Sequence, residues 1–188
     1  LEVEGLGKSQ VRFPVPLEGA HNAMNLLGAI ALAHGLGITS EEMLTGLQTF
    51  LPPPGRSETH QWNGCKVYAD TYNSNPASVE AALQTLFSTQ GSGQSWICLG
   101  DMLEMGNLEE SLHRGLAMPI LQTRVDHVLL FGPRMEKLLG ELRKQNFPGS
   151  LEHFDSHEAM AARLKGSVKA GDRIPVSYTH LTLPTSDL

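Results

Sequence analysis

The sequence predicts an α/β protein in which a parallel-sheet domain follows a shorter, mostly helical segment. From residue 56 onward, short apolar runs alternate with helical patterns, as in sheets built from strands and right-handed crossovers. Residues 1–55 instead contain two helical patterns and little strand signal. Between these parts, Pro52-Pro53-Pro54-Gly55 cannot continue a helix, so we place the domain boundary there.

Composition and charge exclude several functions. The chain has 188 residues, 40% hydrophobic content and a net charge of -6, which is typical of a soluble globular protein. Its apolar runs are too short to span a bilayer, and no Lys/Arg cluster suggests a membrane or nucleic-acid partner. Neither Cys65 and Cys98 nor the histidines show metal-ligand spacing, so we expect reduced core thiols, no metal and a cytoplasmic protein.

The first part predicts one short strand and two helices. Val11–Pro16 reads as an edge strand, and a helix beginning near Asn22 is apolar nearly all round, so we expect it to be buried. Asn22 and Asn25 share a face of its first turn, either as helix caps or as ligand-binding amides. The next helix should start after Thr39 or Ser40, either of which can cap it.

The second part begins with a hairpin, because Asn63-Gly64 separates two β-prone runs. Helices and strands then alternate, and the last of the helices should be capped by Ser156. The expected elements are a strand over 65–69, a helix over 76–88, a strand over 96–99, a helix over 108–121, a strand over 128–131, a helix over 135–144, a strand over 151–154 and a helix over 156–164. This order predicts a small Rossmann-like layer sandwich.

Polar residues gather where two of these strands end. Asp70-Thr71-Tyr72-Asn73-Ser74-Asn75 lies between a strand and a helix opened by Pro76. Asp101 and Glu104 follow the next strand in the same way. Open α/β sheets bind ligands at this edge. The alternatives are an ordinary capped loop for the first group and a helix or turn cap at Asp101.

Arg56 follows the proline-rich connector directly, so the sequence places a cation at the hinge between two domains, where ligand sites are common. The alternative is a surface arginine paired with Glu58.

Four motifs in this order carry a resemblance to a known family over about residues 11–174. They are Gly19-Ala20-His21-Asn22-Ala23-Met24-Asn25, Pro53-Pro54-Gly55-Arg56-Ser57-Glu58, Asp70-Thr71-Tyr72-Asn73-Ser74-Asn75-Pro76, and Leu99-Gly100-Asp101-Met102-Leu103-Glu104-Met105-Gly106 followed by His113. With these motifs the sequence resembles the Mur ligase family. Members have a UDP-sugar-binding domain, a central ATPase domain and a C-terminal Rossmann-like domain. The resemblance implies that residues 1–55 end the central domain and that residues 56–174 form the C-terminal domain.

The resemblance also implies an activity in peptidoglycan synthesis. Family members use ATP, with Mg²⁺, to convert a substrate carboxylate into an acyl phosphate, which an amine then attacks. The third and fourth motifs point to the addition of D-alanyl-D-alanine to UDP-N-acetylmuramoyl-tripeptide. The alternatives are another ligase of the Mur and folylpolyglutamate synthase superfamily, or a non-catalytic nucleotide-binding or partner-binding α/β module.

Carried over by motif, the resemblance gives roles to individual residues. Asn22 and Asn25 would meet the adenine, Asp70 the ribose, and Arg56 the phosphates, where it would also act in catalysis. A nucleotide would then bridge the two domains. The residues implied to be near the substrate or behind these groups are His21, Tyr72, Asn73, Asn75, Asp101 and Glu104.

The sequence departs from the family in two places. The family's phosphate-cradling Gly-Lys-Thr/Ser loop, its magnesium ligands and its substrate lysine belong to a region upstream of these motifs, so we expect a fragment that is inactive alone. Gly5-Leu6-Gly7-Lys8-Ser9 lacks the flanking strand, helix and glycine of such a loop, and we interpret it as a surface turn. Residues 175–188 match no expected strand, and Pro175 should interrupt the last one, so we interpret them as a non-native tail.

Overall fold

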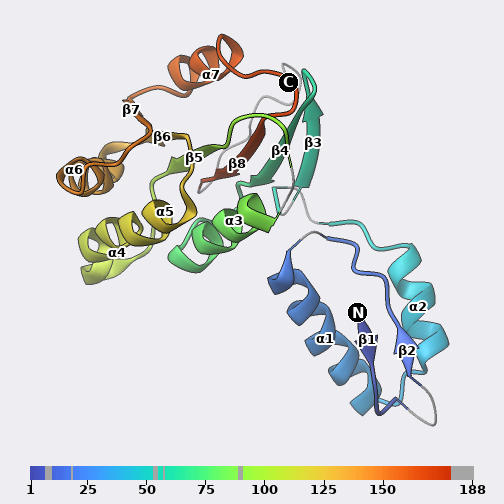
Figure 1. Cartoon of the computed structure of the whole chain (residues 1–188). Helices are drawn as coiled ribbons and strands as arrows, with labels where there is room; N and C mark the ends of the chain where they lie inside the picture. The colour runs from blue at the N-terminus through green and yellow to red at the C-terminus, as the bar shows by residue number, and fades with distance from the viewer. Residues whose placement is uncertain (7–9, 18, 53–54, 57, 89–90, 179–188) are drawn as a thin grey trace. The chain divides into compact units, whose positions relative to one another are not determined.

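The computed structural model describes residues 1–6, 10–17, 19–52, 55–56, 58–88 and 91–178 (Figure 1). Its internal contacts divide the chain into two compact units, Leu1–Pro53 and Pro54–Leu188. Within the described ranges, no helix is both long enough and apolar enough to cross a membrane. The predicted turn at 5–9 and the predicted tail at 175–188 lie partly outside these ranges.

The first unit combines a hairpin with two helices. β1 (Glu2–Val3) pairs antiparallel with β2 (Val11–Arg12), so the expected strand over 11–16 is shorter than predicted. α1 spans Ala20–Gly35 and α2 spans Ser40–Gln48. Thr39 caps α2 in a capping box, in which its Oγ1 accepts from the Glu42 N–H and the Glu42 carboxylate accepts from the Thr39 N–H.

The expectation that α1 is buried is wrong. Among the residues that the structure describes in α1, only Ile30 is buried, while Met24 and Leu32 are 66% and 69% exposed. Ile30 packs with Val3 and Phe13 in the small core of this unit. Leu26 and Leu27 are half-buried against this core, whereas Met24 and Leu32 lie on the part of the helix that the short hairpin and α2 leave uncovered.

The second unit is built on one six-stranded sheet, which confirms the predicted α/β class. Its strands are β3 (Glu58–Trp62), β4 (Cys65–Asp70), β5 (Trp96–Gly100), β6 (His127–Phe131), β7 (Ser150–Phe154) and β8 (Arg173–Ser177). They lie in the order β3-β4-β8-β5-β6-β7, all parallel except β3. The β3–β4 hairpin turns at Asn63 and Gly64, both with positive φ, as its sequence predicts.

Helices cover both faces of this sheet. α3 (Pro76–Ser88), α4 (Glu109–Gly115), α5 (Ala117–Thr123) and α6 (Glu136–Lys144) lie on one face, and α7 (His157–Lys165) lies on the other (Figure 1). Side chains alternate along β5 accordingly, since Ile97 and Leu99 join the core under the first four helices and Trp96 and Cys98 join the core under α7. Burial raises the pKa of the free Cys98 thiol to about 12, so it is an inert core residue, as expected.

Helix positions agree with the prediction at α3 and at α7, where Ser156 accepts from the Ala159 N–H as the N-cap. The single helix expected over 108–121 is wrong. The chain instead forms a 3-10 turn (η1, Gly106–Leu108), then α4 and α5, which are separated at Leu116. Pro119 has no N–H and its ring crowds the carbonyl four residues earlier, so one continuous helix cannot form through this stretch. The helix expected over 135–144 likewise begins with a 3-10 turn, η2 (Pro133–Met135).

The expectation that Pro175 interrupts the last strand is also wrong. β8 runs through Pro175 to Ser177 in the centre of the sheet, and Tyr178 after it is buried. All five residues of β8 pair with β4. On its other side, β8 pairs with β5 and the residue just before it at Arg173, Val176 and Ser177, all in the same register. Ile174 and Pro175, which lie between them, form no bridge to β5. The missing N–H of Pro175 therefore coincides with a local gap in one ladder without ending the strand.

Two packed histidines make stability depend on pH. The His127 ring stacks on Trp96 with centroids 3.7 Å apart, and His157 lies 3.7 Å from Phe131. Burial lowers the pKa of both imidazoles. Because the unfolded chain then binds protons more readily, their contribution is complete above the ordinary histidine pKa of about 6.5 and is lost as the pH falls below it.

We therefore expect the free energy of unfolding in urea to fall between pH 7.5 and pH 5.5. A His127→Gln, His157→Gln variant should show a flatter profile over this window. The pKa of Glu152 is lowered by its hydrogen bond to Arg163, so its contribution is lost only at more acidic pH. An equally steep profile in the double variant would contradict the assignment.

Candidate functional site

The segment Gly55–Arg56 is fastened to the loop that follows β4. The Gly55 carbonyl accepts from the N–H groups of Thr71, at 2.8 Å, and Tyr72, at 3.0 Å. The Gly55 N–H donates to Glu58 Oε1 at 2.8 Å. These bonds bring two motifs that the sequence separates, the connector and the Asp70–Asn75 loop, to the carboxyl edge of the sheet.

Arg56 lies over an aromatic ring in this arrangement. Its guanidinium carbon is 4.1 Å from the centroid of the Tyr72 ring, and Tyr72 is 51% exposed. The carboxylate of Glu58, the alternative partner considered for Arg56, accepts from Gly55 and contacts His60 Nε2 at 2.8 Å. The exposed Arg56 guanidinium therefore stacks on the Tyr72 ring instead of pairing with the Glu58 carboxylate.

The loop after β4 has an inward and an outward side. Ser74 is buried, with its Oγ 3.0 Å from Ser177 Oγ. Asn75 caps α3, because its Oδ1 accepts from the Ser78 N–H and its own N–H donates to Ser78 Oγ, both at 3.0 Å. Asn73 is exposed, and Asp70, the last residue of β4, is half-buried. Ser74 and Asn75 therefore fix the conformation of the loop, while Tyr72 and Asn73 face solvent.

The amides of the first unit are not helix caps. α1 begins at Ala20 with Gly19 as its N-cap and no side-chain cap bond, so Asn22 and Asn25 lie inside the helix. Asn22 is half-buried, and Asn25 and His21 are exposed. The N-cap role considered for the two asparagines is therefore wrong, and their role toward a ligand stays a prediction.

A substitution at Gly55 should weaken the hydrogen bonds that join the Gly55 carbonyl to the loop after β4. Gly55 has φ +74°, and a Cβ there would lie 3.1 Å from Thr71 Oγ1 and 3.4 Å from the Tyr72 nitrogen. We expect Gly55→Ala to cost about 1 kcal/mol of unfolding free energy, measured in urea. Gly140→Ala is the matched control, because that glycine lies in α6 with open space around it and should stabilise by about 0.5–1 kcal/mol. A Gly55→Ala protein as stable as the parent would contradict this description.

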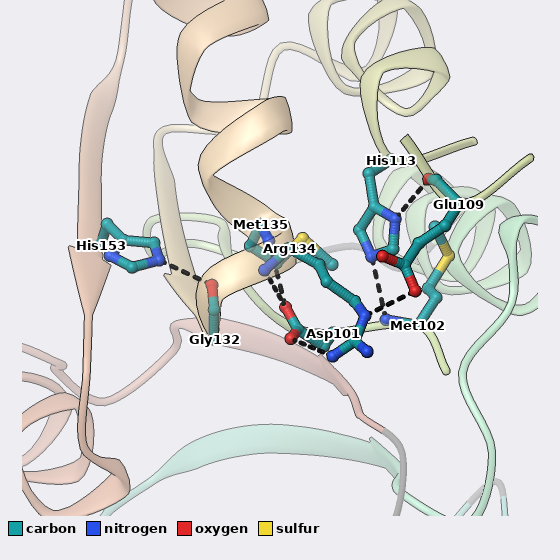
Figure 2. A network of polar contacts seen from close by, with 8 residues as sticks. All are labelled: Asp101, Met102, Glu109, His113, Gly132, Arg134, Met135 and His153. Atoms are coloured by element: carbon teal, nitrogen blue, oxygen red, sulfur yellow. Dashed lines mark hydrogen bonds and ion pairs between the residues drawn. The ribbon is translucent and has the colours of Figure 1, made fainter. Parts of the chain in front are cut away.

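A second polar network lies at the ends of β5 and β6 (Figure 2). Asp101 Oδ1 accepts from the backbone N–H groups of Arg134 and Met135, both at 3.0 Å, and so caps the turn η2 that leads into α6. Arg134 Nη1 lies 3.3 Å from Asp101 Oδ2, and its Nε donates to Glu109 Oε2 at 2.6 Å. The hydrogen bond to Glu109, and to a lesser degree that to Asp101, raises the pKa of Arg134. Of the alternatives for Asp101, the structure supports a cap.

His113 also contacts the loop that carries Asp101. Its Nε2 accepts from the Met102 N–H at 3.1 Å, so its Nδ1 carries the proton and donates to the Glu109 carbonyl at 2.7 Å (Figure 2). The ring is fully buried, which makes it a structural residue. Glu104 is exposed with φ +63° in the same loop. Among the described residues, no group of three or more His, Cys, Asp or Glu could hold a metal ion.

Sequence reasoning missed Arg134 and Glu109. Arg134 follows the carboxyl end of β6 by three residues, the same signal that singled out Asp101 after β5. Glu109 opens α4 and gave no such signal, since its partner lies 25 residues away.

Comparison with known proteins identifies the family to which this chain belongs. Residues 55–177 match the family model described as Mur ligase, glutamate ligase domain, and the chain belongs to the Mur ligase family.

Among its relatives by sequence are UDP-N-acetylmuramoyl-tripeptide–D-alanyl-D-alanine ligases. The chain is 31% identical to that of Bacillus subtilis over 164 residues, which cover 86% of the chain and 36% of the relative. It is 31% identical to that of Escherichia coli over 152 residues, 80% of the chain and 32% of the relative. The chain thus spans about a third of the length of these relatives.

Solved structures of MurF enzymes superpose on most of this chain. A MurF structure from Acinetobacter baumannii superposes with a TM-score of 0.76 at 25% identity, covering 96% of this chain and 39% of that one. MurF from Thermotoga maritima, solved in complex with ADP, superposes with a TM-score of 0.71 at 21% identity, covering 91% and 37%, and shares the fold.

Proposed function

We propose that the chain is the C-terminal part of a cytoplasmic, ATP-dependent amide-bond ligase that adds D-alanyl-D-alanine to UDP-N-acetylmuramoyl-tripeptide in peptidoglycan synthesis. Family membership and the names of its relatives support the proposal. The observation that carries it is the exposed Arg56 guanidinium, held over Tyr72 in the loop that follows β4, at the edge where parallel sheets bind ligands. In this proposal residues 1–55 belong to the ATPase domain and residues 56–174 to the C-terminal domain.

The chemistry of the residues suits the parts of ATP assigned to them. Asn22 and Asn25 carry amides, which can both donate to and accept from an adenine edge. The Asp70 carboxylate can accept from both ribose hydroxyls. Arg56 offers fixed N–H donors to phosphate oxygens, whose charge shifts during phosphoryl transfer.

The remaining candidates have supporting places in the proposal. We assign them to the substrate side or to the residues behind the nucleotide contacts: His21, Tyr72, Asn73, Asn75, Asp101 and Glu104. Mg²⁺, when bound, would neutralise charge on the transferring phosphate, and we assign its ligands to a part of the ligase outside the described ranges.

A chimera tests the proposal. The chain would replace the matching C-terminal third of the Bacillus subtilis relative, and phosphate release would be followed with ATP, Mg²⁺, UDP-N-acetylmuramoyl-tripeptide and D-alanyl-D-alanine. We expect turnover that requires D-alanyl-D-alanine. The 188-residue chain alone should give none, because its sequence offers no Gly-Lys-Thr/Ser loop opening a helix to stabilise the transferred phosphate.

The controls separate the competing functions. Turnover with glutamate or another amino acid in place of D-alanyl-D-alanine would favour another ligase of the superfamily. A folded chimera that binds ATP without turnover would favour a non-catalytic nucleotide-binding module. Turnover by the chain alone would overturn the expectation that it is inactive.

A further inference from the structure

We propose that Tyr72 is a positioning residue, whose ring holds the Arg56 guanidinium in the orientation that meets the phosphates. This inference rests on the proposed function and adds a residue role to it. It starts from the 4.1 Å separation between the Arg56 guanidinium carbon and the Tyr72 ring centroid.

The geometry of a guanidinium explains why a ring is suited to this task. All N–H donors of arginine lie in the guanidinium plane, whereas its attraction to an aromatic ring acts through the face of that plane. A carboxylate partner would use the in-plane donors that a phosphate needs. Stacking on Tyr72 holds the side chain through the face of the guanidinium and does not itself use those in-plane donors.

Neighbouring contacts favour this interpretation over a chance surface contact. Glu58 is nearby in sequence, but its two carboxylate oxygens are engaged by Gly55 and His60. The Tyr72 N–H donates to the Gly55 carbonyl, so the residue that carries the ring is bonded to the residue preceding the arginine. The ring and the guanidinium are therefore brought together by the backbone as well as by their mutual attraction.

Orientation matters because arginine has a long and flexible side chain. An exposed arginine without a partner samples many rotamers, and fixing it when substrate binds costs entropy. A guanidinium already held over Tyr72 in the loop after β4 avoids part of that cost, which is the general benefit of preorganised charge in catalysis.

Variants at Tyr72 test the inference in the active chimera. We expect Tyr72→Leu to lower kcat about three- to ten-fold with little change in KM for D-alanyl-D-alanine. Tyr72→Phe keeps the ring and should retain the parent kcat. Phe87→Leu is the control, because it removes another exposed ring, from α3. In an Arg56→Ala background, Tyr72→Leu should cause no further loss.

A spectroscopic measurement on the 188-residue chain keeps the two proposals distinguishable. The Arg56 Nε–H proton should show a ring-current shift by NMR that Tyr72→Phe retains and Tyr72→Leu removes. An unchanged kcat in Tyr72→Leu, an equal loss in Tyr72→Phe, or no ring-current shift would overturn the role of Tyr72. A folded parent chimera without turnover would instead overturn the proposed ligase function.

Discussion

Arg56→Ala should lower kcat of the chimeric ligase by about 10²- to 10³-fold, measured as phosphate release that depends on D-alanyl-D-alanine. The proposed role of the guanidinium is to stabilise charge that develops on the phosphate oxygens, so its removal should affect the chemical step more than substrate binding. Arg56→Lys keeps the charge and loses the planar set of donors, and we expect it to recover only part of the rate.

The matched control for this experiment is Arg143→Ala. Arg143 is an exposed arginine in the last turn of α6 and should leave kcat unchanged. Circular dichroism and urea unfolding would check that both variants fold like the parent. A fully active Arg56→Ala chimera would remove Arg56 from the catalytic assignment.

Asp172→Ala should destabilise the chain by roughly 3–5 kcal/mol. The Asp172 side chain is buried, in a residue only 3% exposed. It accepts from the Gln94 N–H at 2.7 Å, from Trp96 Nε1 at 3.0 Å and from the Lys169 N–H at 3.0 Å. Truncation leaves these donors without their acceptor in the interior, and the penalty for such groups exceeds the net worth of the bonds.

Urea unfolding measures this effect, and Asp155→Ala is its control. Asp155 has a fully exposed side chain, so its removal should change stability by no more than about 0.5 kcal/mol. Asp172→Asn retains one acceptor oxygen and should lie between the parent and Asp172→Ala. Equal stabilities of Asp172→Ala and Asp155→Ala would show that the buried bonds contribute little.

Much of the second unit could be predicted because its signals are local. The positive φ values of Asn63 and Gly64, the cap at Ser156 and the helix start at Pro76 each follow from the chemistry of the residues themselves. Alternation along β5 also predicts which side chains meet which helical layer. Such features depend on neighbours within a few positions in the chain.

The wrong predictions involve competition between local signals and packing. The apolar pattern over 108–121 predicts one helix, but Pro119 lacks the backbone donor that a continuous helix needs, and the stretch is divided into α4 and α5. At Pro175 the opposite error occurred, since a local rule against proline was outweighed by full pairing with β4 on the other side. Burial of α1 depends on what covers it, which periodicity along one helix does not reveal.

Sequence rules single out candidate site residues but not the contacts that those residues make. The strand-end rule identified Asp70 and Asp101, and the connector drew attention to Arg56. The stacking of Arg56 on Tyr72 depends on backbone bonds from Gly55 across a hairpin, which sequence spacing does not encode. Arg134 reaches Asp101 by a comparable long-range fold contact.

The local gap between β8 and β5 has a consequence for how the sheet holds together. Because Pro175 cannot donate a ladder bond, the two halves of the sheet, β3-β4-β8 and β5-β6-β7, have one backbone donor fewer where they meet at mid-strand. Trp96 and Cys98 from one half meet Ile174 and Val176 from the other in a single apolar cluster under α7. Apolar packing under α7 therefore supplements the backbone pairing at the place where that pairing lacks a donor.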